Sequence, residues 1–400
     1  MGRNYPVDTL VIDAAAAITL EDIAEQAERA KAVVSQVRGR MLAPNARKKP
    51  PTFSTAQLMV LTGLDKSQVD YRLRKGDLPG GTLNSTGSRR EFSLAEVRHW
   101  VREHRREELR PERAEAITIT IGNFKGGVTK TTTALTLAQG LSLRGHKVLM
   151  IDCDPQGSMT TLFGLLPDSD VEIEDTVLPL LTGKQAELSY AVRPTYWDGI
   201  DLVAAASFLF SAEFFLPARQ SREPNFEFWN LLHYGIDTLR PQYDVIIIDT
   251  PPALSYVTIN ALMASDGIIM PLPPSALDFA SSAQFWDLFS DLTTQLITDR
   301  GGKKEFAFID VLLAKVEAKD HAGMMVREWI AAAYTDKVLP VEIPKTMAAN
   351  ASSAEFGTVY DPSPEGSGAR TVKRAYEAYD RFVELIEDQT QTFWRRQMEA

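Results

Sequence analysis

The sequence has almost no cysteine and lacks any long uncharged apolar segment. Cys153 is the only cysteine among 400 residues, which excludes an internal disulfide framework and an iron–sulfur site built only from cysteines of this chain. No uncharged apolar run reaches the roughly 18 residues of a membrane span, and residues 1–6 lack the apolar segment of a signal peptide. These features predict a cytoplasmic protein that does not enter a membrane.

Charge is distributed unevenly along the chain. Residues 34–113 carry 17 Lys and Arg against 9 Asp and Glu, whereas the remainder carries 26 against 44. This asymmetry predicts a nucleic-acid-binding module beside an acidic domain, with a merely solvated charged surface as the alternative. With 44% apolar residues, the chain can bury a full α/β core and one smaller domain.

Residues 19–42 carry an apolar seam whose spacing alternates between three and four. The seam consists of Leu20, Ile23, Ala27, Ala30, Val34, Val37 and Met41. With Thr19 as its N-cap, this pattern predicts a dimer-forming or domain-bridging helix within residues 1–46. A single helix packed on its own domain is the alternative. The proline-rich, basic residues 43–52 predict a linker.

Residues 53–76 have the pattern of two short helices joined by a tight turn. Ser54 or Thr55 caps the first helix, residues 62–65 form the turn, and the second helix begins near Lys66. In a helix–turn–helix the second helix enters the major groove of DNA. The outward-facing candidates for DNA contact are Ser67, Gln68, Tyr71, Arg72 and Lys75.

Residues 82–92 predict a hairpin with a basic tip, and Ser93 caps a helix that runs through Trp100. Arg89 and Arg90 at the tip are candidate contacts to backbone phosphates. Together, residues 47–113 resemble a MerR-like winged helix–turn–helix. A small helical domain used for protein contacts is the alternative.

The segment Arg102–Arg113 alternates in charge sign. This pattern predicts a solvated helix end and a hinge before the next domain.

A phosphate-binding loop is predicted where the alternating β-branched run Ile117–Ile121 leads through a glycine-containing turn into an apolar helical pattern. Gly126 and Gly127 lack the Cβ atoms that would keep N–H groups from phosphate oxygens, and the helix N-terminus adds positive charge. Lys130 can then reach the outer phosphates and the Thr131 hydroxyl can ligate Mg²⁺. A glycine-rich turn with a chance lysine pair is the alternative.

The motif from Lys125 to Thr132, Lys-Gly-Gly-Val-Thr-Lys-Thr-Thr, resembles the deviant Walker-A loop of the ParA/MinD group of ATPases, within it the large plasmid partition class. The resemblance implies ATP and Mg²⁺ as cofactors and a homodimer in which Lys125 reaches the partner subunit's phosphates. Thr129 replaces the last loop glycine and costs backbone freedom. The implied nucleotide-binding residues are Lys125, Gly126, Gly127, Val128, Thr129, Lys130, Thr131 and Thr132.

Two carboxylates follow the next predicted strand, at residues 147–152. Asp152 and Asp154 lie on the same side because strand side chains repeat every second residue. In the resembled family the second aspartate of Asp-x-Asp-Pro-Gln orients the attacking water and the first supports the metal region, which implies these roles for Asp154 and Asp152. A simple strand cap is the alternative. Cys153 faces the opposite way, into the core.

The segment 243–252 predicts a third buried strand, with Asp249 at its carboxyl end and two prolines after it. It resembles a Walker-B motif, which implies that Asp249 lies near Mg²⁺. Residues 267–274, 306–313 and 338–344 supply further strands. The fold class predicted for residues 114–400 is α/β, a mostly parallel sheet with helices on both faces, as in P-loop NTPases.

The C-terminal part supplies further candidates. The resemblance implies that Pro344 borders the adenine and that basic residues here, Lys345, Arg370, Lys373 and Arg374, bind DNA without sequence preference; a solvated charge cluster is the alternative. The final helix, residues 372–394, has one apolar face but an acidic polar face, which favours packing onto the sheet over a membrane. The aromatic residues within 167–240 are expected to pack in the core.

These patterns together predict a cytoplasmic, nucleoid-associated DNA-partition ATPase. Its partners would be DNA, a ParB-type centromere-binding protein and a second copy of the chain, and it would repress its own operon. A nucleotide-sensing repressor without a segregation role and a MinD-like membrane-cycling ATPase are the alternatives.

Overall fold

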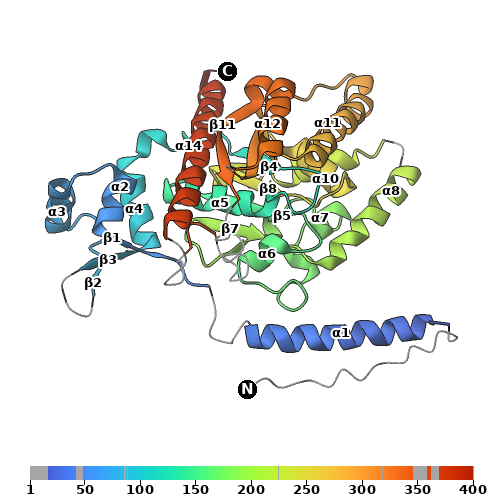
Figure 1. The fold of residues 1–400 in the computed structure, drawn as a ribbon, viewed down its shortest axis with the longest axis horizontal. Coiled ribbons are helices and arrows are strands. Elements are labelled where there is room, and N and C mark those ends of the chain that lie inside the picture. Colours follow the sequence, from blue (N-terminus) through green and yellow to red (C-terminus); the bar gives the residue numbers. More distant parts are fainter. Residues whose placement is uncertain are drawn as a thin grey trace. The chain divides into compact units, whose positions relative to one another are not determined.

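The computed structural model of the chain describes residues 17–41, 48–84, 87, 89–223, 225–317, 319–345, 358–361 and 369–399. The chain divides into two compact units, Met1–Lys48 and Lys49–Ala400, and each is described by itself. Figure 1 shows the ribbon with its element labels.

The described part of the first unit is one helix, α1 (Leu20–Met41). Thr19 caps it as predicted, because its hydroxyl accepts from the Asp22 N–H at 3.2 Å while its own N–H donates to the Asp22 carboxylate at 2.7 Å. The seam residues Leu20 and Ile23 are exposed, so the first half of the seam is uncovered among the residues described. The side chains of the second half lie outside the described residues, and the dimer-forming role stays a prediction.

The second unit opens with a small module, residues 52–104, of three helices and a three-stranded antiparallel sheet in the order β1-β3-β2. Its elements are β1 (Thr52–Ser54), α2 (Thr55–Thr62), α3 (Lys66–Lys75), β2 (Thr82–Leu83), β3 (Arg90–Ser93) and α4 (Leu94–His104). Capping boxes begin the three helices at Ser54, Asp65 and Ser93. The two predicted helices, their turn and the hairpin strands are confirmed; Ser88 at the hairpin tip lies outside the described residues.

An eight-stranded sheet forms the centre of the second unit, in the order β11-β10-β9-β4-β8-β5-β7-β6. All pairs are parallel except β6 with β7. The strands are β4 (Ile117–Ile121), β5 (Val148–Asp152), β6 (Arg193–Pro194), β7 (Ile200–Val203), β8 (Val245–Asp249), β9 (Gly267–Leu272), β10 (Phe308–Val316) and β11 (Val338–Pro344). Every predicted strand is confirmed, whereas β6 and β7 were not predicted.

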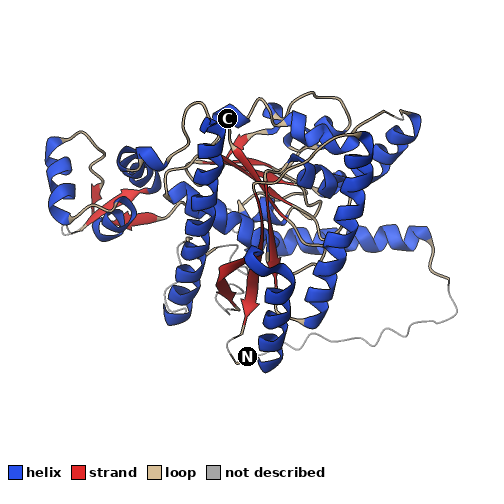
Figure 2. Ribbon diagram, turned by 90° about the horizontal axis from the view of Figure 1, so that it is seen from above, coloured by secondary structure: helices blue, strands red, loops and turns tan. Residues whose placement is uncertain are grey.

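Helices cover both faces of this sheet, as predicted (Figure 2). They are α5 (Lys130–Leu143), α6 (Ser158–Leu162), α7 (Leu178–Leu181), α8 (Ala212–Arg222), α9 (Leu231–Gly235), α10 (Tyr256–Ala264), α11 (Ala276–Leu296), α12 (His321–Tyr334) and α14 (Ala369–Glu399). Side chains of successive strand residues point to opposite faces of the sheet. Ile247 belongs to a buried apolar cluster with residues of α5 and α14, and Ile248 belongs to another with residues of α9 and α10.

Helix α14 packs on the sheet and on α5, as predicted. Phe382, Val383 and Ile386 are fully buried, and Val383 lies so close to Gly140 that a Cβ added there would come within 2.5 Å of it. The apolar face of α14 is therefore used inside the protein. Among the described residues, no helix has both the length and the apolar character needed to cross a membrane.

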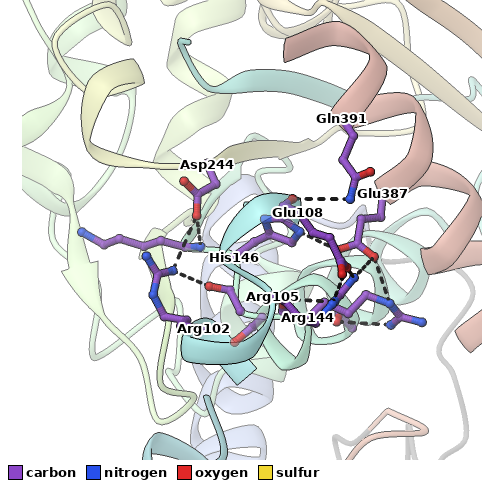
Figure 3. Close-up of polar contacts among 12 residues, drawn as sticks. Arg102, Arg105, Glu108, Arg144, His146, Asp244, Glu387 and Gln391 are labelled. Carbon is purple, nitrogen blue, oxygen red and sulfur yellow. Dashed lines mark hydrogen bonds and ion pairs between the residues drawn. The ribbon is translucent and has the colours of Figure 1, made fainter. Parts of the chain in front are cut away.

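Two arginines of α4, Arg98 and Arg102, fasten the small module to the end of α5; Figure 3 shows Arg102. Arg98 Nε donates to the Ser142 carbonyl at 3.0 Å and its NH2 donates to the His146 carbonyl at 2.9 Å, while Arg102 donates to the Gly145 carbonyl. The last carbonyls of a helix have no partner within it, and cations stabilise that end. The module is thus held at the C-terminal end of the helix that follows the phosphate loop.

The predicted solvated hinge at Arg102–Arg113 is wrong for Arg105 and Arg110, which pair with carboxylates of distant elements. Arg106 and Arg113 are exposed, as predicted. Arg105 NH2 lies 3.1 Å from Glu387 Oε2, and Arg110 Nε lies 3.2 Å from Asp244 Oδ1. The side chains of Arg105 and Arg110 are only 17% and 12% exposed. Alternating charge predicted solvent contact, but long-range partners bury these groups.

The expectation that the aromatic residues of 167–240 pack in the core is wrong for part of them. Phe228 and Trp229 are buried, but Phe210 and Phe214 are 51% and 78% exposed. Helix α8 buries only its small or aliphatic residues Ala212 and Leu216, which leaves the neighbouring aromatic rings outside.

Candidate active site

The loop between β4 and α5 turns through two residues with positive φ. Gly127 has φ +73° and Thr129 has φ +77°. A threonine in the left-handed region is strained, so the predicted backbone cost of Thr129 is confirmed. Asn123 holds the start of the loop, since its side chain accepts from the Lys125 N–H at 3.0 Å and donates to the Pro271 carbonyl at 2.9 Å.

Lys130 is the first residue of α5 and is only 7% exposed. Its Nζ donates to the Lys125 carbonyl at 3.1 Å, so the side chain folds back along the loop. Burial lowers the pKa of Lys130, and the charges of Asp249 and Asp154 oppose that shift. A phosphate at this position would stabilise the ammonium. Of the other loop candidates, Gly126 is exposed, Val128 is buried and Thr132 is half-buried.

Asp249 ends β8 directly beside Asp152, which ends β5. Both carboxylates are fully buried. Burial, together with the charge of Asp152, raises the pKa of Asp249 to about 8, while the nearby Thr131 hydroxyl and the charge of Lys130 act to lower it. Within the described residues neither oxygen of the Asp249 side chain has a hydrogen-bond partner, which is unusual for a buried carboxylate. This oxygen-only acceptor near the Thr131 hydroxyl fits Mg²⁺.

Asp152, by contrast, has both carboxylate oxygens occupied. Its Oδ2 accepts from the N–H and the hydroxyl of Thr160 at 2.9 and 2.7 Å, and its Oδ1 accepts from the Asp154 N–H at 3.1 Å. Burial raises the pKa of Asp152 to about 7, although the bonds from Thr160 lower it. Asp152 therefore holds the loop that follows β5, and Asp249 is the better metal ligand.

Asp154 lies on that loop and is 8% exposed. Its Oδ1 accepts from the Gln156 N–H at 2.9 Å. The charge of Asp154 acts on Lys130, so the structure brings the proposed water-orienting carboxylate to the same site as the phosphate-binding lysine.

Lys125 is bound within its own subunit in this structure. Its Nζ lies 2.8 Å from Asp278 Oδ1 in the first turn of α11, and the Lys125 side chain is 38% exposed. No motif in the sequence points to Asp278 as a partner of Lys125. The segment Ser275-Ala-Leu-Asp278 is readable as a helix cap, and Ser275 does cap α11, but its approach to Lys125 depends on the tertiary fold.

The C-terminal candidates lie apart from these contacts. Pro344 is buried at the end of β11, where it pairs with Val316, and its adenine contact stays a prediction. Lys345 pairs with Glu317, and Lys373 lies 3.7 Å from Glu377. Arg374 is exposed on α14. The Arg370 side chain lies outside the described residues.

The candidate DNA contacts of α3 have several local partners. Ser67 and Gln68 bond to the capping residue Asp65, and Arg72 and Lys75 lie 2.8 and 2.7 Å from Asp77. Tyr71 is 58% exposed. At the hairpin, Arg90 donates to the Gly80 carbonyl, whereas Arg89 is exposed. Among these candidates Arg72 and Arg90 are half-buried, and the others are exposed.

Known proteins resemble most of this chain. A family model described as an AAA domain matches residues 116–299. A Rhizobium rhizogenes protein, provisionally named replication protein A, is 29% identical over 92% of this chain and 94% of its own. The chromosome-partitioning ATPase Soj of Thermus thermophilus is 30% identical over 66% of this chain and 96% of its own.

Solved structures share the fold. One titled Partition Protein matches with a TM-score of 0.66 at 20% identity, over 93% of this chain and 98% of its own. Cobyrinic acid a,c-diamide synthase of Mycobacterium smegmatis, solved with ADP and magnesium, matches with a TM-score of 0.51 at 26% identity, over 67% of this chain and 93% of its own.

Proposed function

Because this chain belongs to the ParA/Soj family of partition ATPases, we propose that ATP assembles it into a homodimer that binds DNA and that hydrolysis releases the dimer. It is an ATPase with ATP and Mg²⁺ as its cofactors. The observation that carries the proposal is the juxtaposition of buried Lys130 with the unpartnered carboxylate of Asp249.

Each residue of this site would have its own role in phosphoryl transfer. Lys130 would bind the outer phosphates, and Thr131 and Asp249 would hold Mg²⁺, which neutralises phosphate charge when bound. Asp154 would orient the attacking water. The loop glycines, Gly126 and Gly127, leave their backbone N–H groups accessible to phosphate oxygens.

Dimerisation is proposed to depend on Lys125 leaving Asp278. In one subunit Lys125 is paired at 2.8 Å, yet it is partly exposed and its flexible stem can reach outward. In the dimer it would bind the partner subunit's nucleotide. The pair is open on the Lys125 side, where the side chain is 38% exposed, but nearly closed on the Asp278 side, at 11%. The several negative charges of a nucleotide's phosphates would compete with this single carboxylate for Lys125.

Substituting Asp278→Asn should therefore strengthen the ATP-dependent dimer. Asparagine preserves size and capping ability while removing the charge that retains Lys125, and we expect the dimer dissociation constant to fall by about two- to fivefold. Sedimentation velocity with ATP and Mg²⁺ measures it. Asp287→Asn, an exposed position on the same helix, is the matched control. If Lys125→Ala dimerised like the unmodified protein, the proposed exchange would be refuted.

The module of residues 52–104 is proposed to be the operator-binding winged helix–turn–helix, within a domain spanning 47–113. Its support is the helix–turn–helix α2–α3 followed by the β2–β3 hairpin, together with the local excess of basic residues. Through this module the protein would repress its own operon, and a ParB-type centromere-binding protein would stimulate hydrolysis. Sequence-independent DNA binding would involve Lys373 and Arg374.

The Tyr71→Ala substitution tests the DNA-recognition face. Because the ring is exposed, its removal should leave stability unchanged but weaken binding to the DNA upstream of the protein's own gene by about tenfold. Fluorescence anisotropy against that DNA and a shuffled duplex measures both affinities. Tyr234→Ala, 57% exposed on α9, is the control. Equal losses on both duplexes would contradict sequence recognition by this helix.

The two alternatives are separable from this function. A membrane-cycling ATPase would need an available apolar helix face, and that of α14 is buried against α5. A nucleotide-sensing repressor would bind ATP without stimulated turnover, so steady-state hydrolysis with DNA and the ParB-type partner distinguishes it.

A further inference from the structure

Thr160, in the short helix α6, joins two buried groups that no sequence motif connects. Its side chain is fully buried. The hydroxyl lies 2.7 Å from Asp152 Oδ2 and 2.9 Å from the Ala205 nitrogen, just beyond the end of β7. One hydroxyl carries one donor and can accept. The Thr160 hydroxyl therefore donates to Asp152 and accepts from the Ala205 N–H.

These bonds close the loop that carries Asp154. The Asp152 carboxylate binds the Thr160 N–H at one end of the segment and the Asp154 N–H at the other, at 2.9 and 3.1 Å. Asp154 in turn accepts from the Gln156 N–H at 2.9 Å. Of the side-chain hydrogen bonds just described, one joins this loop to the neighbouring strand of the sheet. It is the bond that the Thr160 hydroxyl accepts from the Ala205 N–H.

The loop has little room to adjust by itself. Gly157 has φ +61°, and a Cβ added there would lie 2.5 Å from Pro167 Cγ and 2.9 Å from the Ala205 carbonyl oxygen. Its backbone therefore passes tightly between neighbours. Because the loop is packed this closely, the loss of one of its hydrogen bonds should displace the other residues of the loop.

We propose that Thr160 is a positioning residue for ATP hydrolysis: through its hydroxyl it fixes Asp152, and through Asp152 it sets the backbone from which Asp154 projects. This inference rests on the proposed role of Asp154 in orienting water. Thr160 acts through buried groups and not through the phosphates. Its loss should therefore change turnover more than nucleotide binding, because misplacement of a reacting group by about 1 Å costs up to a hundredfold in rate.

The test compares steady-state ATP hydrolysis of three threonine variants. Thr160→Val keeps the branched shape and removes the hydroxyl, and we expect kcat to fall about tenfold or more while KM for ATP stays within about threefold. Thr160→Ser should restore most of kcat. Thr161→Val is the matched control, because the Thr161 hydroxyl donates to the Gly157 carbonyl at 2.9 Å, within its own turn of the chain.

Two further variants keep the outcome interpretable. Thr160→Val leaves the buried Ala205 N–H without an acceptor and can lower stability, so Asp152→Asn, which preserves the Thr160–Ala205 bond, should reproduce the kcat loss. Asp154→Asn tests the premise: if it hydrolyses ATP normally, the proposed role of Asp154 fails. If Asp154→Asn is inactive but Thr160→Val keeps full kcat, or if Thr160→Ser is as slow as Thr160→Val, the positioning role alone is refuted.

Discussion

ATP hydrolysis by the Lys130→Ala variant should fall at least about a hundredfold in kcat/KM, because the ammonium is the buried positive charge nearest the expected phosphates. It is held at the N-terminus of α5, with its Nζ 3.1 Å from the Lys125 carbonyl. The charges of Asp249 and Asp154 would lose their counter-charge when Lys130 is removed. Phosphate release from purified protein with ATP and Mg²⁺ measures the loss.

The control for this experiment is Lys184→Ala, which removes an exposed lysine from a surface turn and should leave kcat/KM unchanged. Far-ultraviolet circular dichroism verifies that both variants are folded. Hydrolysis by Lys130→Ala at the unmodified rate would show that the triphosphate is bound elsewhere, and the assignments of Thr131 and Asp249 would fall with it.

The parts of the site that sequence could predict are those set by local pattern. Lys130 follows a β-branched strand and begins an apolar helix, so the strand–loop–helix geometry places it without reference to distant residues. Asp249 is similarly placed by strand β8. Asp278 and Thr160 could not be predicted because their partners, Lys125 and Asp152, are reached only through the packing of separate elements.

The same distinction explains the error at the domain junction. The charge alternation of Arg102–Arg113 indicates an exposed segment when neighbours along the chain are considered alone. Arg105 instead reaches Glu387, 282 residues away. Ion pairs of this range leave no periodic signal. Helix caps depend on neighbours within four residues, so the cap at Ser93 and one of the two candidates for the first helix, Ser54, could be predicted from the sequence.

The Glu387→Ala variant should be destabilised by about 3 kcal/mol, because removing one partner of a buried ionic cluster leaves the others without a counter-charge. Glu387 is 3% exposed. Its carboxylate lies 2.7 Å from His146 Nε2, 3.1 Å from Arg105 NH2 and 3.3 Å from Arg144 Nε (Figure 3). Urea unfolding followed by tryptophan fluorescence measures the loss, since the Trp394 ring lies 5.6 Å from that of His146.

The acid side of the stability profile should change in the same variant. Burial raises the pKa of Glu387, but the bonds from His146 and Arg105 outweigh burial, so its pKa lies below the ordinary 4.5. A depressed carboxylate pKa contributes stability above the unfolded value that is lost as pH falls through the folded one. Glu387→Ala should therefore lose less stability below pH 4.5 than the unmodified protein. The control is Glu384→Ala, which removes an exposed carboxylate paired with Arg381 and should change stability by no more than about 0.5 kcal/mol. Equal effects of the two substitutions would show that the buried ion pairs of Glu387 stabilise the protein no more than an exposed pair does.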